Sequence, residues 1–454
     1  MDAGPTPSVD AGVTGPLGRP DGSARLPSVD REIVLPYFGD PVMEDLEVEG
    51  TVGTLDVFFS IDTTGSFGGE IDNLQGTLRS RILPELRDRV ADVQLGVGRF
   101  EDFPGEPYGA STDVPFLLLT GITSRESAVT NAVASLDQPL GNGGDIEESS
   151  AEALWQIATG EGYGSLVSEY RGSGLGGVGF REDALRAVVH VTDAPTHAPR
   201  DYGDRFPGTH DVTEATVALR ELGVRVIGIA SGSAARAHLE AVALGTDAVV
   251  APERGACNTG IDGRPRAPRD GVCPLVFDVN PDGSGVGDAI VDALVDLLST
   301  IQYDEVWAET DDMLGFVRTI EAVEAEPPDG VDPPSLADLR PPGDGIDDTF
   351  LGVGPGTRLA FRAILRNETI RPADYDQIFN LELRVVGDGV TLLTRRIRVI
   401  VPRGRLDAGA SPTDAGSDAG SDAGSDAGSD AGSDAGSDAG SDAALPGDAG
   451  VDAG

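Results

Sequence analysis

Short apolar runs that alternate with amphipathic helix patterns constrain the fold of residues 54–301 more than any other feature. Residues 55–61 are almost entirely apolar and end at Asp62, which is typical of a strand buried on both faces. Ile71, Leu74 and Leu78 then recur at the spacing of one helix face. This alternation predicts an α/β fold with a doubly wound, mostly parallel sheet. Further strand patterns lie at 93–100, 114–119, 187–192, 224–230 and 274–279, and further helix patterns at 153–158, 212–222 and 286–298.

Residues 302–405 follow a two-residue period instead. Apolar and polar residues alternate over 358–366, over 381–385 and again over 397–401, and Gly387-Asp388-Gly389 is a hairpin turn signal. This pattern predicts an additional β-sandwich domain. Residues 31–53 alternate in the same way but are too few to fold alone. We expect them to add strands to the sandwich, so that the α/β domain (54–301) is an insertion in it.

The two ends of the chain lack the apolar residues needed for a core. Residues 1–30 and 406–454 are rich in Asp, Ala, Gly, Ser and Pro, and the sequence SDAG occurs six times in succession from Ser417. A four-residue period is too short to build a stacked repeat fold. We therefore predict disordered acidic termini, with the repeat tail acting as a solvated spacer.

The charge of the chain excludes several classes of partner. Asp and Glu total 77 against 33 basic residues, a formal net charge of −44, and the sequence contains no lysine. Nucleic acids and anionic membrane surfaces are not expected partners, because they are bound through Lys and Arg. The missing lysine also excludes a Walker A loop and Schiff-base catalysis. Neither a transmembrane segment nor a secretion signal is visible.

Cys257 and Cys273 are the only cysteines and bracket a polar loop. Two cysteines without a CxxC motif or a nearby histidine make a poor zinc site. A disulfide between them would indicate an oxidising compartment. The alternative is a pair of buried free thiols.

Acidic and hydroxyl side chains follow several of the predicted strands. Because the carboxyl ends of parallel strands meet at one edge of a sheet, these side chains are expected to converge there. A carboxylate and hydroxyls on one tight loop offer oxygen ligands of the kind that Mg²⁺ prefers. Crowded carboxylates without a cation would repel one another. The groups are Asp62, Thr64 and Ser66 in the sequence DTTGS; Asp102 in GRFED; Asp145, Glu147 and Glu148 in GGDIEE; and Asp193 in TDAP.

These motifs resemble the metal-ion-dependent adhesion site (MIDAS) of the von Willebrand factor type A (vWA) fold. Asp62, Thr64 and Ser66 match the D-x-S-x-S sequence of its first loop, with Thr in place of the first Ser. Asp193 matches its third loop, and Glu148 occupies the position of its second loop. The resemblance covers residues 54–301 and implies that these five residues hold Mg²⁺ or Mn²⁺.

Glu148 at that position makes the chain most similar to the integrin β-subunit I-like domain. That resemblance implies a second, Ca²⁺ site formed by Asp102, Asp145, Glu148 and the carbonyl of Glu147. It also implies a third site at Ser66 and Glu70, although Gly69 stands where the family has an acid. The sequence TDAPTH is similar to the family's T-D-A-x-x-H, and we expect His197 to lie outside the ligand set or to be exposed.

The resemblance implies an extracellular or cell-surface binding module. A bound cation would capture an Asp or Glu carboxylate of a protein partner, for adhesion or assembly. One alternative is a structural surface protein whose cation only stabilises the domain. Another is that Asp62 and Asp193 cap helix N-termini without metal. A metal-dependent hydrolase would need a general base such as Glu148 or His197 beside the ion, and we do not expect an enzyme.

Overall fold

The structure is a computed structural model that describes residues 28–49, 52–136, 140–141 and 144–404. It is a mixed α/β structure with one mostly parallel sheet and several further sheets. The predicted disordered segments, 1–30 and 406–454, fall outside the described residues except for residues 28–30.

A six-stranded sheet forms the centre of residues 54–301, with the strand order β10-β7-β6-β3-β4-β5. Neighbouring strands are parallel except at the edge, where β5 runs antiparallel to β4. In chain order β3 is the first strand of this sheet. It lies between the second strand, β4, and the fourth strand, β6. Such a reversal of strand order opens a crevice at the carboxyl ends of the strands. The strands are β3 (Thr54–Asp62), β4 (Asp92–Phe100), β5 (Leu117–Thr123), β6 (Leu185–Thr192), β7 (Val224–Ala230) and β10 (Val276–Asp278).

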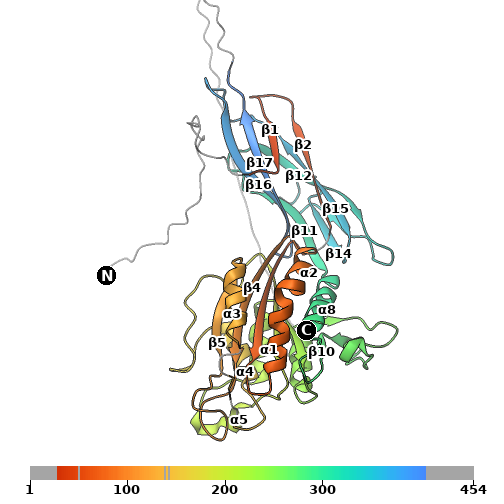
Figure 1. The fold of residues 1–454 in the computed structure, drawn as a ribbon. Coiled ribbons are helices and arrows are strands. Elements are labelled where there is room, and N and C mark those ends of the chain that lie inside the picture. The colour runs from red at the N-terminus through yellow and green to blue at the C-terminus, as the bar shows by residue number, and fades with distance from the viewer. Residues whose placement is uncertain (1–27, 50–51, 137–139, 142–143, 405–454) are drawn as a thin grey trace, which may run out of the picture. The chain divides into compact units, whose positions relative to one another are not determined.

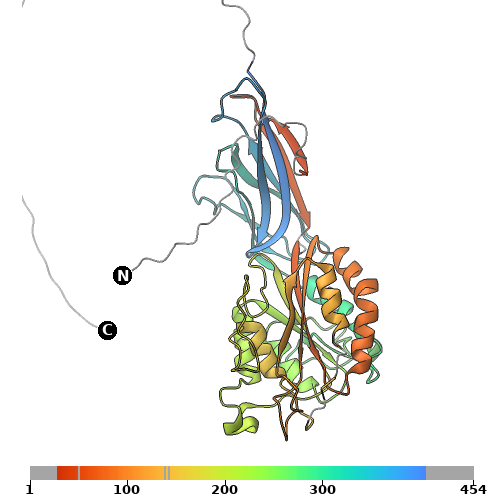
Figure 2. The same cartoon turned by 60° about the vertical axis from the view of Figure 1, so that its left-hand side comes forward.

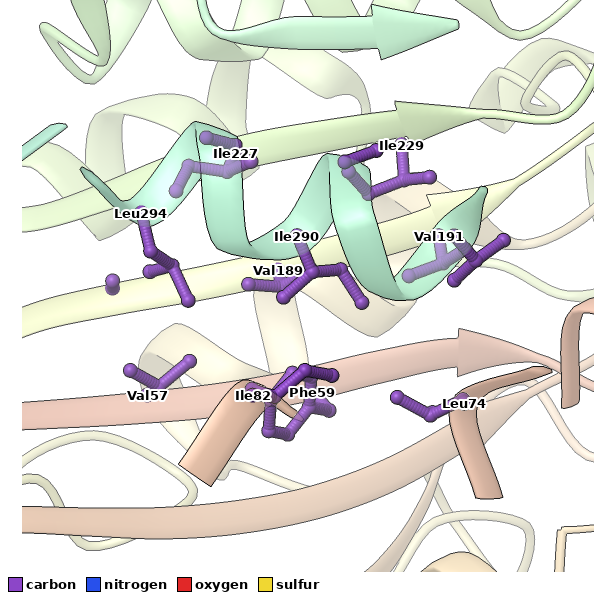
Figure 3. Packing of buried hydrophobic residues seen from close by; sticks show 14 of the residues in the cluster. Val57, Phe59, Leu74, Ile82, Val189, Val191, Ile227, Ile229, Ile290 and Leu294 are labelled. Atoms are coloured by element: carbon purple, nitrogen blue, oxygen red, sulfur yellow. The ribbon is translucent and has the colours of Figure 1, made fainter. Parts of the chain in front are cut away.

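Helices cover both faces of this sheet (Figure 1). On one face, Phe59, Val189 and Ile229 pack with Leu74 of α1 and Leu294 of α8 in a single buried cluster (Figure 3). On the other face, β-strand residues such as Phe58 and Val188 pack against α4 and α6. The helices are α1 (Gly68–Thr77), α2 (Leu83–Arg87), α3 (Glu126–Ala134), α4 (Ser150–Thr159), α5 (Pro199–Tyr202), α6 (Val212–Glu221), α7 (Arg236–Gly245) and α8 (Val286–Ser299).

The helix after β3 is not continuous. A π-helical turn, Leu78–Ile82, separates α1 from α2, and Pro84 lies in the first turn of α2. Proline is tolerated there because the first backbone N–H groups of a helix have no partner within the helix. The π-helical turn therefore lies directly before the helix that contains the proline.

Two further sheets share the second hydrophobic core of the chain (Figure 2). One has the order β1-β17-β16-β11-β14-β13 and the other β12-β15-β2. The predicted hairpin at residues 387–389 is confirmed, since β16 and β17 are antiparallel and Asp388 has a φ of 46°. The strands are β1 (Arg31–Val34), β2 (Val42–Glu49), β11 (Tyr303–Thr310), β12 (Val317–Glu326), β13 (Ser335–Ala337), β14 (Thr349–Val353), β15 (Arg358–Leu365), β16 (Gln377–Gly387) and β17 (Val390–Val401).

Strands β1 and β2 precede the α/β residues in the chain but pair with strands that follow them. β1 runs parallel to β17, and β2 runs antiparallel to β15. Alternate residues of β2, such as Leu46, enter the core beside Phe361. Residues 31–49 therefore contribute to the same core as residues 303–401.

Cys257 and Cys273 form a disulfide, as one of the two sequence hypotheses predicts. Cys273 lies in β9 (Cys273–Pro274), which pairs with β8 (Val249–Val250). In the described part of the chain, every helix is too short or too polar to cross a membrane.

Candidate metal centre

The order of the strands brings two acidic residues to one edge of the sheet. β3 and β6 are parallel neighbours, with Ile61 beside Val191. Asp62 is the last residue of β3, and Asp193 follows the last residue of β6. Burial raises the pKa of Asp62 most, and the nearby charge of Asp193 raises that pKa further, which indicates that the two carboxylates are close.

Backbone hydrogen bonds fix the loop that carries Glu148 between the loops that follow β3 and β6. The backbone N–H of Glu148 donates to the carbonyl of Pro195 (2.9 Å), and that of His197 donates to the carbonyl of Glu148 (3.0 Å). On the other side, the N–H of Gly141 donates to the carbonyl of Thr63 (2.9 Å). Three loops far apart in the sequence thus form one structural unit.

These loops enclose a pocket of about 300 Å³ at the sheet edge. Four of the five predicted ligands of the adhesion site line it: Thr64, Ser66, Glu148 and Asp193. Residues with hydroxyl or carboxylate side chains therefore border a common space from three different loops. The remaining residues around the pocket are Gly65, Asp145, Ile146 and Ala194.

The fifth predicted ligand, Asp62, lies behind the pocket and does not line it. Its side chain is fully buried, and both of its oxygens accept hydrogen bonds. Oδ1 accepts from the backbone N–H and the hydroxyl of Thr64 (2.9 and 2.7 Å), and Oδ2 accepts from the hydroxyl of Thr192 (2.7 Å). Asp62 therefore orients the hydroxyl of Thr64 through these hydrogen bonds, and its predicted contact with an ion stays a prediction.

The pocket favours a cation electrostatically. Burial and the charges of Asp62, Asp102 and other nearby carboxylates raise the pKa of Glu148 to about 10. Burial also raises the pKa of Asp62 to about 7, although hydrogen bonds from Thr192 and Thr64 act in the opposite direction. The Oε2 atom of Glu148 is buried and receives no hydrogen bond. A divalent ion would supply the missing partner and favour the charged carboxylates, so these residues fit a hard cation.

Part of the predicted Ca²⁺ site lies in a cluster of residues that could hold a metal ion. Asp102 and Asp145 are brought together, but the third group beside them is the imidazole of His197. Glu147 and Glu148 do not belong to this cluster, in which the candidate ligand atoms lie within 4.8 Å of one another. His197 is 7% exposed, so of the two expected positions, outside the ligand set or exposed to solvent, the exposed one is excluded. The TDAPTH motif was the sequence signal for its position.

At the predicted third site, the structure places Glu70 in a buried position beside Ser231. Glu70 is buried, accepts a hydrogen bond from the hydroxyl of Ser231 and leaves its Oε2 atom without a partner. A Cβ atom at position 69 would collide with the backbone carbonyl oxygen of Asp282. The close approach of that loop explains why glycine stands where the resembling family has an acid.

Comparisons with known proteins give only distant likenesses. No protein-family model and no curated protein matches the chain. A von Willebrand factor type A protein from Catenulispora acidiphila is similar over 82% of this chain and 72% of its own, with 13% identity and a TM-score of 0.31. Proximal thread matrix protein 1 from the mussel byssus is similar over 56% of this chain and 51% of its own, with 15% identity and a TM-score of 0.33. Because both TM-scores are below 0.5, neither likeness assigns a family.

Proposed function

We propose that the chain is a vWA-like binding module that captures a carboxylate of a protein partner through a divalent cation. The observation that carries this proposal is the pocket lined by Thr64, Ser66, Glu148 and Asp193. These residues would hold Mg²⁺ or Mn²⁺. The ion would supply an open coordination position that attracts an Asp or Glu side chain.

The residues around the pocket have separate roles in this proposal. Thr64 and Ser66 present hydroxyl oxygens, and the buried Asp62 orients the hydroxyl of Thr64. Glu148 contributes the carboxylate that lacks a hydrogen-bond donor. Asp193 adds negative charge from the third loop. Because the module itself is strongly acidic, the ion is needed before a negatively charged ligand group can approach.

We also propose that the module acts without catalysis and outside the cytosol. The nearest imidazole, His197, faces Asp102 and Asp145 and is not among the residues that line the pocket. A general base beside the ion is therefore not supplied by a histidine. The disulfide between Cys257 and Cys273 supports an oxidising compartment, such as the cell exterior.

The test uses Mn²⁺ as a paramagnetic probe of the pocket in the full chain. Water bound to Mn²⁺ enhances the relaxation of solvent protons, and a carboxylate that displaces this water reduces the enhancement. We expect the capped peptide Gly-Asp-Gly to reduce it and the matched peptide Gly-Asn-Gly to leave it unchanged. Equal effects of the two peptides, or a selective effect of Gly-Asp-Gly that survives in the Ser66→Ala variant, would contradict capture at this pocket.

A further inference from the structure

A second cluster of possible metal ligands lies beside the pocket but is built from different atoms. Asp102 follows β4, Asp145 belongs to the loop before α4, and His197 follows β6. We propose that these three residues bind a borderline transition-metal ion of the class of Zn²⁺, in place of the Ca²⁺ predicted from the sequence. This site shares Asp145 with the lining of the Mg²⁺ pocket, whereas Asp102 and His197 lie outside that lining, and the inference does not depend on the proposed function.

The distances within the cluster suit a single small ion. The Nε2 atom of His197 lies 3.1 Å from Oδ2 of Asp102 and 3.3 Å from Oδ1 of Asp145. Ligands about 2.0–2.1 Å from a tetrahedral zinc ion are separated from one another by about 3.3 Å. Three protein ligands would leave a fourth position for water, as in zinc sites that remain open.

Buried atoms in the cluster lack partners of their own. The Oδ2 atom of Asp102 is buried and accepts no well-aligned hydrogen bond, although the imidazole is near it. The side chain of Asp102 is fully buried and that of His197 nearly so. In the described part of the chain, no arginine forms an ion pair with Asp102 or Asp145. An ion at this position would satisfy the unpaired oxygen and neutralise both carboxylates.

Neighbouring groups hold the ligands in orientation. The other oxygen of Asp102, Oδ1, accepts hydrogen bonds from the hydroxyl of Tyr202 and the backbone N–H of Phe103, which leaves Oδ2 directed at the cluster. The Nδ1 atom of His197 lies 3.9 Å from a carboxylate oxygen of Asp201, which is too far for a hydrogen bond, and is without a partner. The backbone of His197 is held instead by its N–H, which donates to the carbonyl of Glu148.

The imidazole decides which class of ion fits. Calcium takes six to eight oxygen ligands, and a ring nitrogen is not among its preferred donors. Imidazole combined with carboxylates suits zinc and its neighbours in the first transition series. The competing arrangement is metal-free, with a protonated His197 paired to both carboxylates. A metal ion requires the neutral imidazole, so the two arrangements exclude one another.

The experiment titrates the EDTA-treated and desalted full chain with Co²⁺, whose visible absorption reports coordination by nitrogen and oxygen in a site of low coordination number. Excess Mg²⁺ is present to fill the other pocket. We expect an absorption band that saturates at one equivalent and disappears on addition of Zn²⁺, but persists on addition of Ca²⁺. No band, or displacement by Ca²⁺ as efficiently as by Zn²⁺, would overturn the proposal.

Variants test whether Co²⁺ binds at this site rather than in the pocket. They also test whether His197 is a ligand or contributes only to folding. His197→Gln should abolish the band, and Tyr202→Phe should weaken Co²⁺ binding by about 10- to 100-fold. His210→Gln is the matched control, because His210 stacks on Trp155 away from the cluster and should keep the band. Ser66→Ala should also keep it, even if Mg²⁺ binding is lost. A band retained in folded His197→Gln protein, checked by circular dichroism, would contradict the assignment.

Discussion

Two histidines in the core of the α/β domain make its stability depend on pH. His238 in α7 is 8% exposed, and neither of its ring nitrogens has a hydrogen-bond partner. Its ring lies 6.5 Å from that of His190, which is fully buried and contacts the hydroxyl of Ser60. Burial lowers the pKa of His238 to about 4, and burial together with His238 lowers the pKa of His190 well below its usual value.

The direction and size of the effect follow from the pKa of His238. A lowered pKa in the folded state means that only the unfolded chain takes up a proton between about pH 6.5 and pH 4. The stabilising contribution is thus fully present above about pH 6.5 and falls as the pH is lowered. For a shift from about 6.5 to about 4, the free energy of unfolding falls by about 1.8 kcal/mol between pH 7 and pH 5.

The assay is chemical denaturation of the full chain at pH 7 and pH 5, for the wild type and for His238→Gln. The loss of stability on acidification should be smaller in the variant by about 1.8 kcal/mol, because glutamine does not titrate. Other groups that titrate in this range affect both proteins and cancel in the difference. An identical pH dependence in the two proteins would refute the claim that His238 is buried in its neutral form.

Three further predictions concern the fold. Leu294→Ala should lower the free energy of unfolding by about 2–5 kcal/mol because the side chain is fully buried. In the same denaturation experiment, Leu298→Ala should lower the free energy of unfolding by less, because Leu298 is only partly buried. Replacing both Cys257 and Cys273 by serine should lower stability by about 3 kcal/mol through the loop that the disulfide closes, and reducing agent should then have no further effect on the melting temperature. Gly69→Asp should destabilise the chain by about 1–3 kcal/mol rather than create a Ca²⁺ site, so a gain in Ca²⁺ affinity would contradict the packing described here.

Most strands of the sheet could be predicted because buried parallel strands are nearly continuous apolar runs. Residues 55–61 and 187–192 show this clearly, and β3 and β6 occupy them almost residue for residue. The apolar pattern predicts the edge strand at 114–119, whereas β5 spans Leu117–Thr123. This strand is antiparallel and only partly buried, so its apolar pattern is less continuous and its bounds are harder to predict. Helix α3 was missed because its buried face consists only of Val129, Ala132 and Val133, which form a weak pattern.

The sequence predicts which loops form the candidate site, but it does not predict the contacts that individual side chains make there. Acidic residues that directly follow strands, such as Asp62 and Asp193, must lie at one edge of a parallel sheet. The motif TDAPTH indicates a histidine near this edge, but the contacts of His197 could not be predicted, because they depend on the hydrogen bond from its backbone N–H to Glu148. The hydrogen bonds of Asp62 with Thr64 and Thr192 could not be predicted from the sequence either.

The most direct test of the central claim is the melting temperature of the EDTA-treated chain with and without Mg²⁺. At a hundredfold excess over Kd, a bound ion adds about 2.7 kcal/mol to the stability, which corresponds to a shift of several degrees. We predict this shift for the wild type and its loss in Ser66→Ala, whose exposed side chain contributes little to folding. Equal melting temperatures of the wild type with and without Mg²⁺ would contradict a cation site at Thr64, Ser66, Glu148 and Asp193.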